Sequence, residues 1–246
     1  MISNNFLKEQ LLDLRKRIEN FSFQNSLEFF TQSFPNRVVF STSFSMEDQV
    51  ISHIILNEKI PIDIFTLDTG RLFAKTYQVW SMTDKRYKTH ISAYYPKHDR
   101  IERFVSENGP DAFYESVEKR QQCCHIRKVE PLKRALKDKK VWITGLRSEH
   151  SPDRKRLEPL EWDDVHQLLK YHPLLPWTSK EVNEFIQKFY IPYNPLHDQG
   201  FVSIGCAPCT RAINPGESFR SGRWWWEDET KKECGLHLRT QHIYEK

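Results

Sequence analysis

Apolar residues along the chain alternate between helical spacing and short β-branched runs. Residues 5–33 place apolar side chains every three or four positions, which predicts two short helices. Residues 37–43 form a β-branched run that ends in small hydroxyl residues, as is typical of a buried strand that leads into a loop. Helical spacing returns at residues 46–56, and residues 62–67 predict a second strand. This order of elements is a βαβ unit.

The same alternation continues through the middle of the chain. It predicts helices at about residues 74–86 and 126–136, and strands at about residues 89–94 and 141–145. Alternating strands and helices indicate an α/β fold with a mainly parallel sheet and helices on both faces. In such sheets the ligand crevice lies beyond the carboxyl ends of the strands. The loops expected to meet there are residues 41–48, 68–71 and 145–150.

The chain changes character after Tyr171, where prolines become frequent. One further helix is predicted near residues 179–189. From about residue 200 the chain is rich in proline, cysteine and basic residues, which is typical of a loop and a tail. We therefore expect residues 1–200 to form the α/β domain with its N-terminal helices, and residues 201–246 to pack back on it. The three consecutive tryptophans, 224–226, favour such packing, with a role in an interface as the alternative.

The composition excludes several classes of protein. A chain of 246 residues with 38% hydrophobic and 28% charged residues is long enough to bury its own core. No stretch approaches the roughly 18 apolar residues of a membrane span, and the first twenty residues mix charges into an amphipathic pattern. A net charge of +4 is too small to indicate nucleic-acid binding by itself. We expect a cytoplasmic protein with no membrane or nucleic-acid partner.

Five cysteines in such a chain favour metal ligation or thiol chemistry over a disulfide framework. Cys123 and Cys124 are adjacent, and Cys206 and Cys209 are separated by two residues. Four thiolates suit either a tetrahedral zinc ion or an iron–sulfur cluster. Adjacent cysteines on one zinc would close a cramped chelate ring, whereas a four-iron cluster offers each sulfur its own iron. The spacing favours the cluster, with zinc and redox-active thiols as alternatives.

The fifth cysteine, Cys234, follows two lysines and precedes a histidine by three positions. Positive neighbours favour the thiolate form of a cysteine, which is the reactive nucleophile. An inert surface cysteine is the alternative interpretation.

Hydroxyl and basic residues mark two further places. Residues 41–48 carry serines between a strand and a helix, an arrangement that suits a bound phosphate and a simple helix cap equally well. Basic residues flank both cysteine pairs, where they form either a solvated surface or a site for an anion such as sulfate. These are Lys119, Arg120, Arg127, Lys128, Arg211, Arg220 and Arg223.

Five motifs occur in a recognisable order. They are STSFSMED at 41–48, LDTGR at 67–71, KRxxCCxxRK at 119–128, GCxPCTR at 205–211 and ECGLH at 233–237. Together they resemble the assimilatory adenylylsulfate reductases of the phosphoadenylylsulfate reductase family, and the resemblance runs from about Val38 to Arg239. The first loop departs from the family in having Ser45 and Met46 where glycine and alanine are common.

The resemblance implies a fold and a set of functional residues. The fold is an adenine nucleotide α-hydrolase-like sheet domain that binds the nucleotide, followed by a cysteine-bearing tail that completes a [4Fe–4S] cluster and moves during redox chemistry. The nucleophile implied is Cys234. The implied cluster ligands are Cys123, Cys124, Cys206 and Cys209. The implied substrate contacts are Ser41, Ser43, Leu67, Lys128, Gly145, Arg220 and Arg223.

The activity implied is the thioredoxin-dependent reduction of adenylylsulfate to sulfite and AMP through an S-sulfocysteine on Cys234. Thioredoxin or a similar dithiol is the expected donor, and we expect the cluster to orient Lys128 rather than to pass electrons. Alternatives are a phosphoadenylylsulfate or dual-substrate reductase and a zinc-stabilised nucleotide-binding module. A tRNA-thiolating enzyme would need an SGGxDS loop, which this sequence lacks. Whether the chain forms a homo-oligomer stays open.

Overall fold

A single sheet organises the part of the chain that the computed structural model describes, residues 4–150, 154 and 156–228. Its strands are β1 Val38–Thr42, β2 Asp63–Leu67, β3 Ser92–Tyr94, β4 Val141–Ile143, β5 Leu160–Asp163 and β6 Leu168–Tyr171. They lie in the order β3-β2-β1-β4-β6-β5. All neighbours run parallel except β5, which pairs antiparallel with β6 at the edge. The expectation of a mainly parallel sheet is confirmed.

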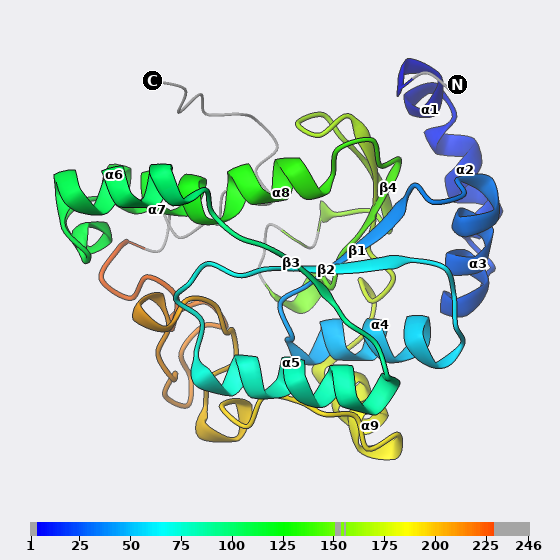
Figure 1. The fold of residues 1–246 in the computed structure, drawn as a ribbon. Helices are drawn as coiled ribbons and strands as arrows, with labels where there is room; N and C mark the ends of the chain where they lie inside the picture. The colour runs from blue at the N-terminus through cyan, green and yellow to red at the C-terminus, as the bar shows by residue number, and fades with distance from the viewer. Residues whose placement is uncertain (1–3, 151–153, 155, 229–246) are drawn as a thin grey trace.

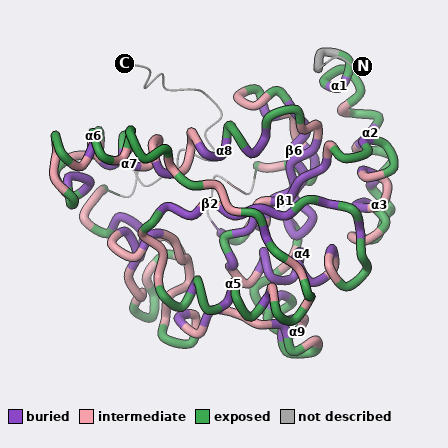
Figure 2. Tube along the Cα trace, viewed as in Figure 1, coloured by how far each residue is buried: buried purple, intermediate pink, exposed green. Residues whose placement is uncertain are grey.

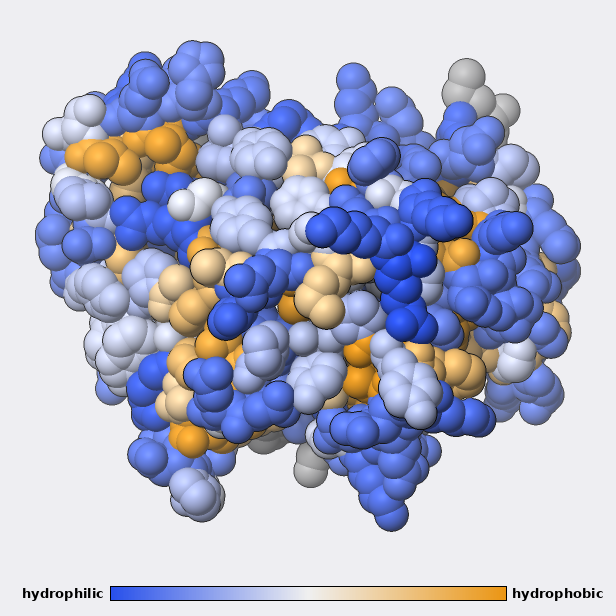
Figure 3. All heavy atoms as spheres, turned by 60° about the horizontal axis from the view of Figure 1, so that its bottom comes forward, coloured by the Kyte–Doolittle hydropathy of each residue, from blue (hydrophilic) through white to orange (hydrophobic). Residues whose placement is uncertain are grey.

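Helices cover both faces of this sheet. They are α1 Asn4–Glu9, α2 Leu11–Ile18, α3 Phe23–Ser33, α4 Met46–Asn57, α5 Ala74–Tyr87, α6 His98–Asn108, α7 Val117–Cys124, α8 Glu130–Ala135 and α9 Ser179–Lys188. Figure 1 shows α6, α7 and α8 on one side of the sheet and α4, α5 and α9 on the other. The face that carries α5 and α9 is mainly hydrophilic, with apolar side chains in scattered patches (Figure 3). Among the described residues, no helix has the length and apolarity to cross a membrane.

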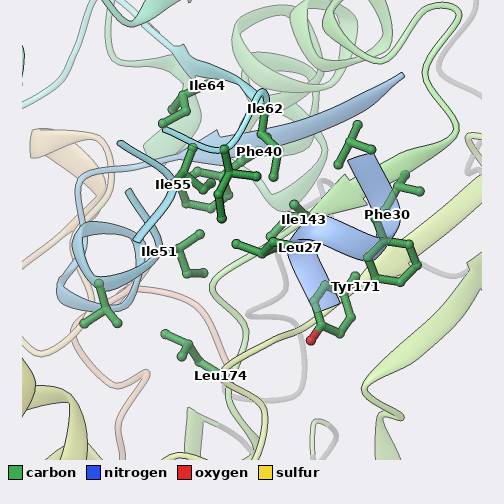
Figure 4. Packing of buried hydrophobic residues seen from close by; sticks show 14 of the residues in the cluster. Leu27, Phe30, Phe40, Ile51, Ile55, Ile62, Ile64, Ile143, Tyr171 and Leu174 are labelled. Carbon is green, nitrogen blue, oxygen red and sulfur yellow. The ribbon is translucent and has the colours of Figure 1, made fainter. Parts of the chain in front are cut away.

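The core lies on both faces of the central strands, which are buried along most of their length (Figure 2). Successive side chains of a strand point to opposite faces. Phe40 of β1 accordingly packs with residues of α3 and α4 such as Leu27 and Ile51 (Figure 4). Its neighbour Val39 packs on the other face with Leu132 of α8. Burial on both faces explains why β1 is apolar without alternation in the sequence.

Three helices occupy residues 4–33, where the apolar spacing predicted two. The chain breaks after Ile18 because Ser22 starts a new helix: its side chain accepts a hydrogen bond of 3.1 Å from the backbone N–H of Asn25. α1 then lies against β6, and α2 lies against the edge strand β5.

The helix predicted at residues 126–136 belongs to a longer helical stretch. α7 begins where the Ser116 side chain accepts a hydrogen bond from the N–H of Lys119, and it ends at the adjacent cysteines. A π-helical turn, His125–Val129, joins it to α8. π turns are rare and occur frequently at functional sites. The helical stretch thus changes from α-helical to π-helical winding directly after Cys124, the last residue of α7.

The hairpin of β5 and β6 did not emerge from the sequence pattern. All four residues of β6 are buried, so the strand shows no alternation of apolar and polar positions. The turn between the strands is held by Asp163, whose carboxylate accepts hydrogen bonds from the N–H groups of Val165 and His166. This aspartate turn is local to residues 163–166, so the hairpin was missed because β6 lacks alternation and not because its turn depends on distant residues.

Residues 201–228 form loops and short 3₁₀ turns that lie against the sheet domain on the side of α5 and α7 (Figure 1). The backbone N–H of Ala207 donates to the carbonyl of Arg71, and Leu72 forms an isolated bridge with Cys206. Trp224 is almost fully buried and Trp226 partly so, whereas Trp225 is exposed, so the predicted packing holds for only part of the tryptophan run.

Candidate functional site

A cavity of about 220 Å³ opens at the carboxyl ends of β1, β2 and β4. The chain runs outward from β1 through β2 to β3 and then crosses to β4 on the other side of β1, so the loops diverge between β1 and β4. Ligands bind at such switch points. All seven predicted substrate residues line this cavity: Ser41, Ser43, Leu67, Lys128, Gly145, Arg220 and Arg223. Their contacts with a substrate stay predictions. We call this cavity the nucleotide cavity, after the ligand that the sequence predicts.

The loop after β1 is closed by its own side chains. Phe44 has a positive φ of 59°, and its N–H donates to the hydroxyl of Thr42 at 3.0 Å. The Ser45 side chain caps α4 by accepting a hydrogen bond from the N–H of Asp48. The carboxylate of Asp48 in turn accepts hydrogen bonds from the N–H and the hydroxyl of Ser43, at 2.6 and 2.7 Å. The loop is therefore a helix cap whose Ser43 N–H is already bonded to a carboxylate.

Asp48 lies between the loops that follow β1 and β4. A Cβ atom on Gly145 would be 2.2 Å from Oδ1 of Asp48, so the position beside the carboxylate requires glycine. Burial raises the pKa of Asp48 to about 6, although the hydrogen bonds from Ser43 act in the opposite direction. Asp48 was not predicted as a site residue.

A buried ionic network forms another wall of the nucleotide cavity. Oε1 of Glu47 accepts hydrogen bonds from Nε of Arg147 at 2.9 Å and from Nε2 of His150 at 3.0 Å. Nδ1 of His150 lies 2.9 Å from Arg154, which can only donate, so His150 is neutral with its proton on Nε2. Burial would raise the pKa of Glu47, but His150 and Arg147 lower it to about 2.

The His150 ring also stacks on Phe219, with centroids 4.5 Å apart and planes at 19°. Phe219 precedes Arg220, so this contact connects the loop after β4 to the segment that carries two of the predicted substrate residues. Glu47, His150, Arg154 and Phe219 all line the cavity, and sequence reasoning missed them as site residues. The only signals available were the two acidic residues in the first motif and the position of residues 145–150 after a strand.

A second, smaller cavity lies beside the first and contains the two cysteine pairs, all four as free thiols. Its lining residues are Arg71, Phe113, Arg120, Cys123, Cys124, Arg127, Lys128, Cys206, Pro208 and Cys209. One pair comes from the end of α7, and the other brackets a 3₁₀ turn, Ala207–Cys209. We call this the cysteine cavity.

Basic groups and a hydroxyl act on the thiols of the cysteine cavity. Burial would raise the pKa of Cys206, but the charge of Lys128 and a hydrogen bond of 3.3 Å with the Thr69 hydroxyl lower it overall. Arg127 donates to the carbonyl of Thr69 at 2.6 Å and so fixes that residue. Burial raises the pKa of the free Cys209 thiol to about 12. Burial also raises the pKa of Cys123, so the positive environment favours the thiolate, the form in which cysteine binds metals, at Cys206.

The chemistry of the donor set fits an iron–sulfur cluster, because four cysteine thiolates are the ligands such clusters use. Within the described ranges, no group of three or more His, Cys, Asp and Glu side chains is arranged to hold a single metal ion.

Lys128 and Arg223 connect the two cavities. Lys128 lies in the π-helical turn and lines both of them. Arg223 lines the nucleotide cavity, and Nε of its side chain donates to the carbonyl of Cys209 at 3.3 Å. A Cβ atom on Gly205 would lie 2.3 Å from its guanidinium, so glycine makes room for Arg223. The predicted cluster ligands and substrate residues thus share two cations.

A buried ion pair joins Arg120, which lines the cysteine cavity, to Glu227 near the end of the described chain. Arg120 donates two hydrogen bonds to the carboxylate of Glu227, at 2.9 and 2.7 Å, and the side chains are 1% and 3% exposed. Trp224 packs between cations, 4.7 Å from Arg120 and 4.8 Å from Arg223. The predicted nucleophile Cys234 lies outside the described residues.

The other basic residues near the cysteines have local partners. Lys119 of α7 pairs with Glu115, which precedes the helix, and Arg211 pairs with Glu217.

The sheet order and the cavity between β1 and β4 define an α/β fold of the adenine nucleotide α-hydrolase type, with its ligand crevice at the switch point. Residues 37–212 match the phosphoadenosine phosphosulfate reductase domain, and the chain belongs to this family.

The chain is similar to curated proteins and to solved structures. It is 52% identical over 202 residues to an adenosine 5'-phosphosulfate reductase of Allochromatium vinosum, covering 82% of this chain and 79% of that protein. It is 49% identical over 205 residues to the enzyme of the same name from Burkholderia cepacia, covering 83% and 82%. A crystal structure of phosphoadenylyl-sulfate reductase from Candida auris superposes with a TM-score of 0.71 at 26% identity, covering 84% of this chain and 97% of that one. A Candida glabrata FMN adenylyltransferase, at 17% identity and a TM-score of 0.53 over 92% and 85% of the chains, shares the fold alone.

Proposed function

We propose that this chain reduces adenylylsulfate to sulfite and AMP in sulfate assimilation. Family membership makes it an oxidoreductase that acts on a sulfur group. The observation that carries the proposal is the position of Lys128, which lines both the nucleotide cavity and the cysteine cavity. The names of the two bacterial relatives favour adenylylsulfate over its 3'-phosphorylated form.

In our proposal, three cations orient the substrate in the nucleotide cavity. Arg220 and Arg223 both lie over Trp224, which packs in one apolar cluster with Cys123, Cys206 and Cys209. With Lys128 they make the end of the cavity beside the cysteines basic. In our proposal the phosphosulfate lies at this end, where the cations offset the charge that accumulates when a thiolate approaches a sulfate group.

The proposed reaction has two stages. The Cys234 thiolate attacks the sulfur of the sulfo group, an S–S bond forms, and the S–O bond breaks as AMP leaves with its electron pair. A thiolate of the donor, thioredoxin or a similar dithiol, then attacks the sulfur of Cys234 and releases sulfite. The second donor thiol resolves the mixed disulfide and restores Cys234. The dithiol thereby supplies both electrons.

We propose that Cys123, Cys124, Cys206 and Cys209 hold a [4Fe–4S] cluster. When bound, such a cluster supplies a fixed charge beside Lys128, which orients that side chain towards the substrate. In this proposal residues 1–200 form the nucleotide-binding domain, and residues 201–246 complete the cluster, contribute Arg220 and Arg223 to the cavity and carry Cys234. Cysteines that act as cluster ligands or as a nucleophilic thiolate must stay reduced, which supports the cytoplasm as the location.

The proposed activity is tested by anaerobic sulfite release from adenylylsulfate and from phosphoadenylylsulfate, with thioredoxin as the donor. We expect kcat/KM to be at least about tenfold higher for adenylylsulfate, which equals roughly 1.4 kcal/mol of transition-state discrimination. Equal or reversed preference would establish the dual-substrate or phosphoadenylylsulfate alternative, and no sulfite from either substrate would refute the proposal.

The proposed cofactor is tested by metal and sulfide analysis of protein purified without oxygen. The expected result is a brown protein with about four irons per chain, because thiolate-bound iron absorbs visible light. Replacing any of the four cavity cysteines by serine should bleach the protein, whereas the Cys234→Ser variant should keep its colour. One zinc per chain would refute the cluster.

A further inference from the structure

The nucleotide cavity has a basic end and a separate wall in which Glu47 is paired with Arg147 and His150, Arg154 contacts His150, and Asp48 is bonded to Ser43. Its basic end adjoins the cysteine cavity through Lys128 and Arg223. The loops after β1 and β4 bring Ser43 and Gly145 to the two sides of Asp48. Ser43 and Gly145 are predicted nucleotide contacts, so the buried carboxylate lies between two positions where we expect the nucleoside.

The chemical character of this carboxylate follows from its partners. Its Oδ2 accepts two hydrogen bonds from Ser43, and its Oδ1 faces the Cα of Gly145. The negative charge of the neighbouring Glu47 raises the pKa of Asp48 further, whereas a hydrogen bond from the Ser45 side chain lowers it. With a pKa of about 6, raised by burial, Asp48 is mostly ionised at pH 7. It is therefore an acceptor for a neutral donor and repels an anion.

We propose that Asp48 selects nucleotides with a free 3'-hydroxyl group: its carboxylate accepts a hydrogen bond from that hydroxyl and excludes a phosphate ester at the same position. This inference rests on the proposed function, because it takes the phosphosulfate to lie at the basic end and the nucleoside to extend towards Ser43 and Gly145. A charged acceptor makes a strong hydrogen bond with a hydroxyl. A phosphate dianion beside the same carboxylate experiences like-charge repulsion in a desolvated site.

A purely structural role of Asp48 gives a different expectation. The carboxylate holds the Ser43 backbone, so a variant that disturbed the loop would weaken every nucleotide to a similar extent. Asp48→Asn separates the two roles, because an asparagine oxygen still accepts a hydrogen bond from the Ser43 N–H while the charge is removed. Asp63→Asn is a matched control, since Asp63 is an exposed acid that pairs with Lys139 at the start of β2.

The test measures binding of AMP, 3'-deoxy-AMP and adenosine 3',5'-bisphosphate to the iron-loaded protein by calorimetry. In the unaltered protein, AMP should bind at least about tenfold more tightly than either analogue. 3'-Deoxy-AMP lacks the hydroxyl that donates the hydrogen bond, and the bisphosphate adds like-charge repulsion. In Asp48→Asn, the preference for AMP over the bisphosphate should fall by at least about tenfold, while Asp63→Asn keeps it. The kcat/KM ratio for the two phosphosulfates should shift in the same direction.

Each outcome has a definite meaning. A preference in Asp48→Asn that changes less than this, or equal weakening of all three nucleotides, overturns the inference. So does unaltered protein that binds 3'-deoxy-AMP as tightly as AMP, a measurement that needs no variant and holds even if Asp48→Asn fails to fold. If unaltered protein binds AMP but releases no sulfite, the proposed function fails while the binding data still decide the role of Asp48.

Discussion

Glu47 is a buried acid whose charge depends on two partners in a distant loop. Its pKa is about 2, below the ordinary 4.5, because the hydrogen bond from His150 and the charge of Arg147 outweigh the effect of burial. A carboxyl group whose pKa is lowered by folding stabilises the native state above its unfolded pKa, and that stabilisation is lost as the pH falls through the folded pKa. The window for Glu47 is therefore pH 4.5 down to pH 2.

Replacing Glu47 by Gln should lower the free energy of unfolding at pH 7 by about 3 kcal/mol, the value that corresponds to this difference in pKa. The variant should also lose less stability than the unaltered protein between pH 4.5 and pH 2, because it lacks the group that is protonated there. Urea unfolding at a series of pH values measures both effects. The difference between the two proteins isolates Glu47 from other acids and from acid loss of iron. Parallel pH profiles would contradict the assignment.

At the scale of elements, the ion pair between Arg120 and Glu227 fastens the C-terminal segment to α7. Both side chains are almost fully buried and share two hydrogen bonds. Removing one partner leaves an uncompensated buried charge, which costs about 3–5 kcal/mol. Glu227→Ala should therefore lower the free energy of unfolding by that amount, as measured by urea titration of the iron-loaded protein.

An exposed pair at the start of the same helix, between Lys119 of α7 and Glu115 just before it, is the control for this prediction. Glu115 pairs with Lys119 at 2.5 Å, but both side chains are accessible to solvent. Glu115→Ala should cost no more than about 1 kcal/mol. Similar losses in the two variants would mean that burial of Arg120 does not determine the effect.

The sequence pattern predicted elements well where local periodicity and burial agree. β1, α4 and β2 lie within one or two residues of their predicted ranges, because each buries a regular set of side chains. α6 was missed because Phe104 is its only buried residue, which leaves a weak apolar signal. The π turn after Cys124 was missed because its winding is a property of the folded helix, and nothing in residues 125–129 requires it locally.

The candidate site also contains residues that the sequence pattern placed correctly and residues that only the folded chain brings together. Ser43 and Gly145 follow strands, and parallel strands bring their carboxyl ends together, so topology alone placed both at one cavity. Glu47 and Arg147 are 100 residues apart, and only the folded chain pairs them. Buried ion pairs of this kind depend on side-chain placement across loops, which neither spacing nor composition determines.

At the scale of the whole molecule, both cavities lie within the described residues, whereas Cys234 follows them in the sequence. A chain that ends at Asp228 keeps the Arg120–Glu227 pair and both cavities. We expect it to hold iron and to bind AMP with unchanged affinity, and to release no sulfite. The Cys234→Ser variant should behave identically, since a hydroxyl is a far weaker nucleophile than a thiolate.

Mass spectrometry adds a direct reading of the same prediction. Unaltered protein that receives adenylylsulfate without a donor should gain one sulfo group, about 80 Da, on the peptide that contains Cys234. Thioredoxin should then remove it. An adduct on another cysteine, or sulfite release by the shortened chain, would identify a different nucleophile.

The ion pair between Arg120 and Glu227 also sets a lower limit on the effective concentration of the proposed nucleophile, the Cys234 thiolate. Cys234 follows Glu227 by seven residues, and a chain of seven residues spans at most about 25 Å whatever its path. One sulfur confined to a sphere of that radius has an effective concentration of about 25 mM. A thiol supplied from solution would have to reach that concentration before it met the bound sulfo group as often as Cys234 does. Cleaving the chain between Glu227 and Cys234 would therefore slow the first chemical stage by dilution alone, even with every side chain of both cavities intact.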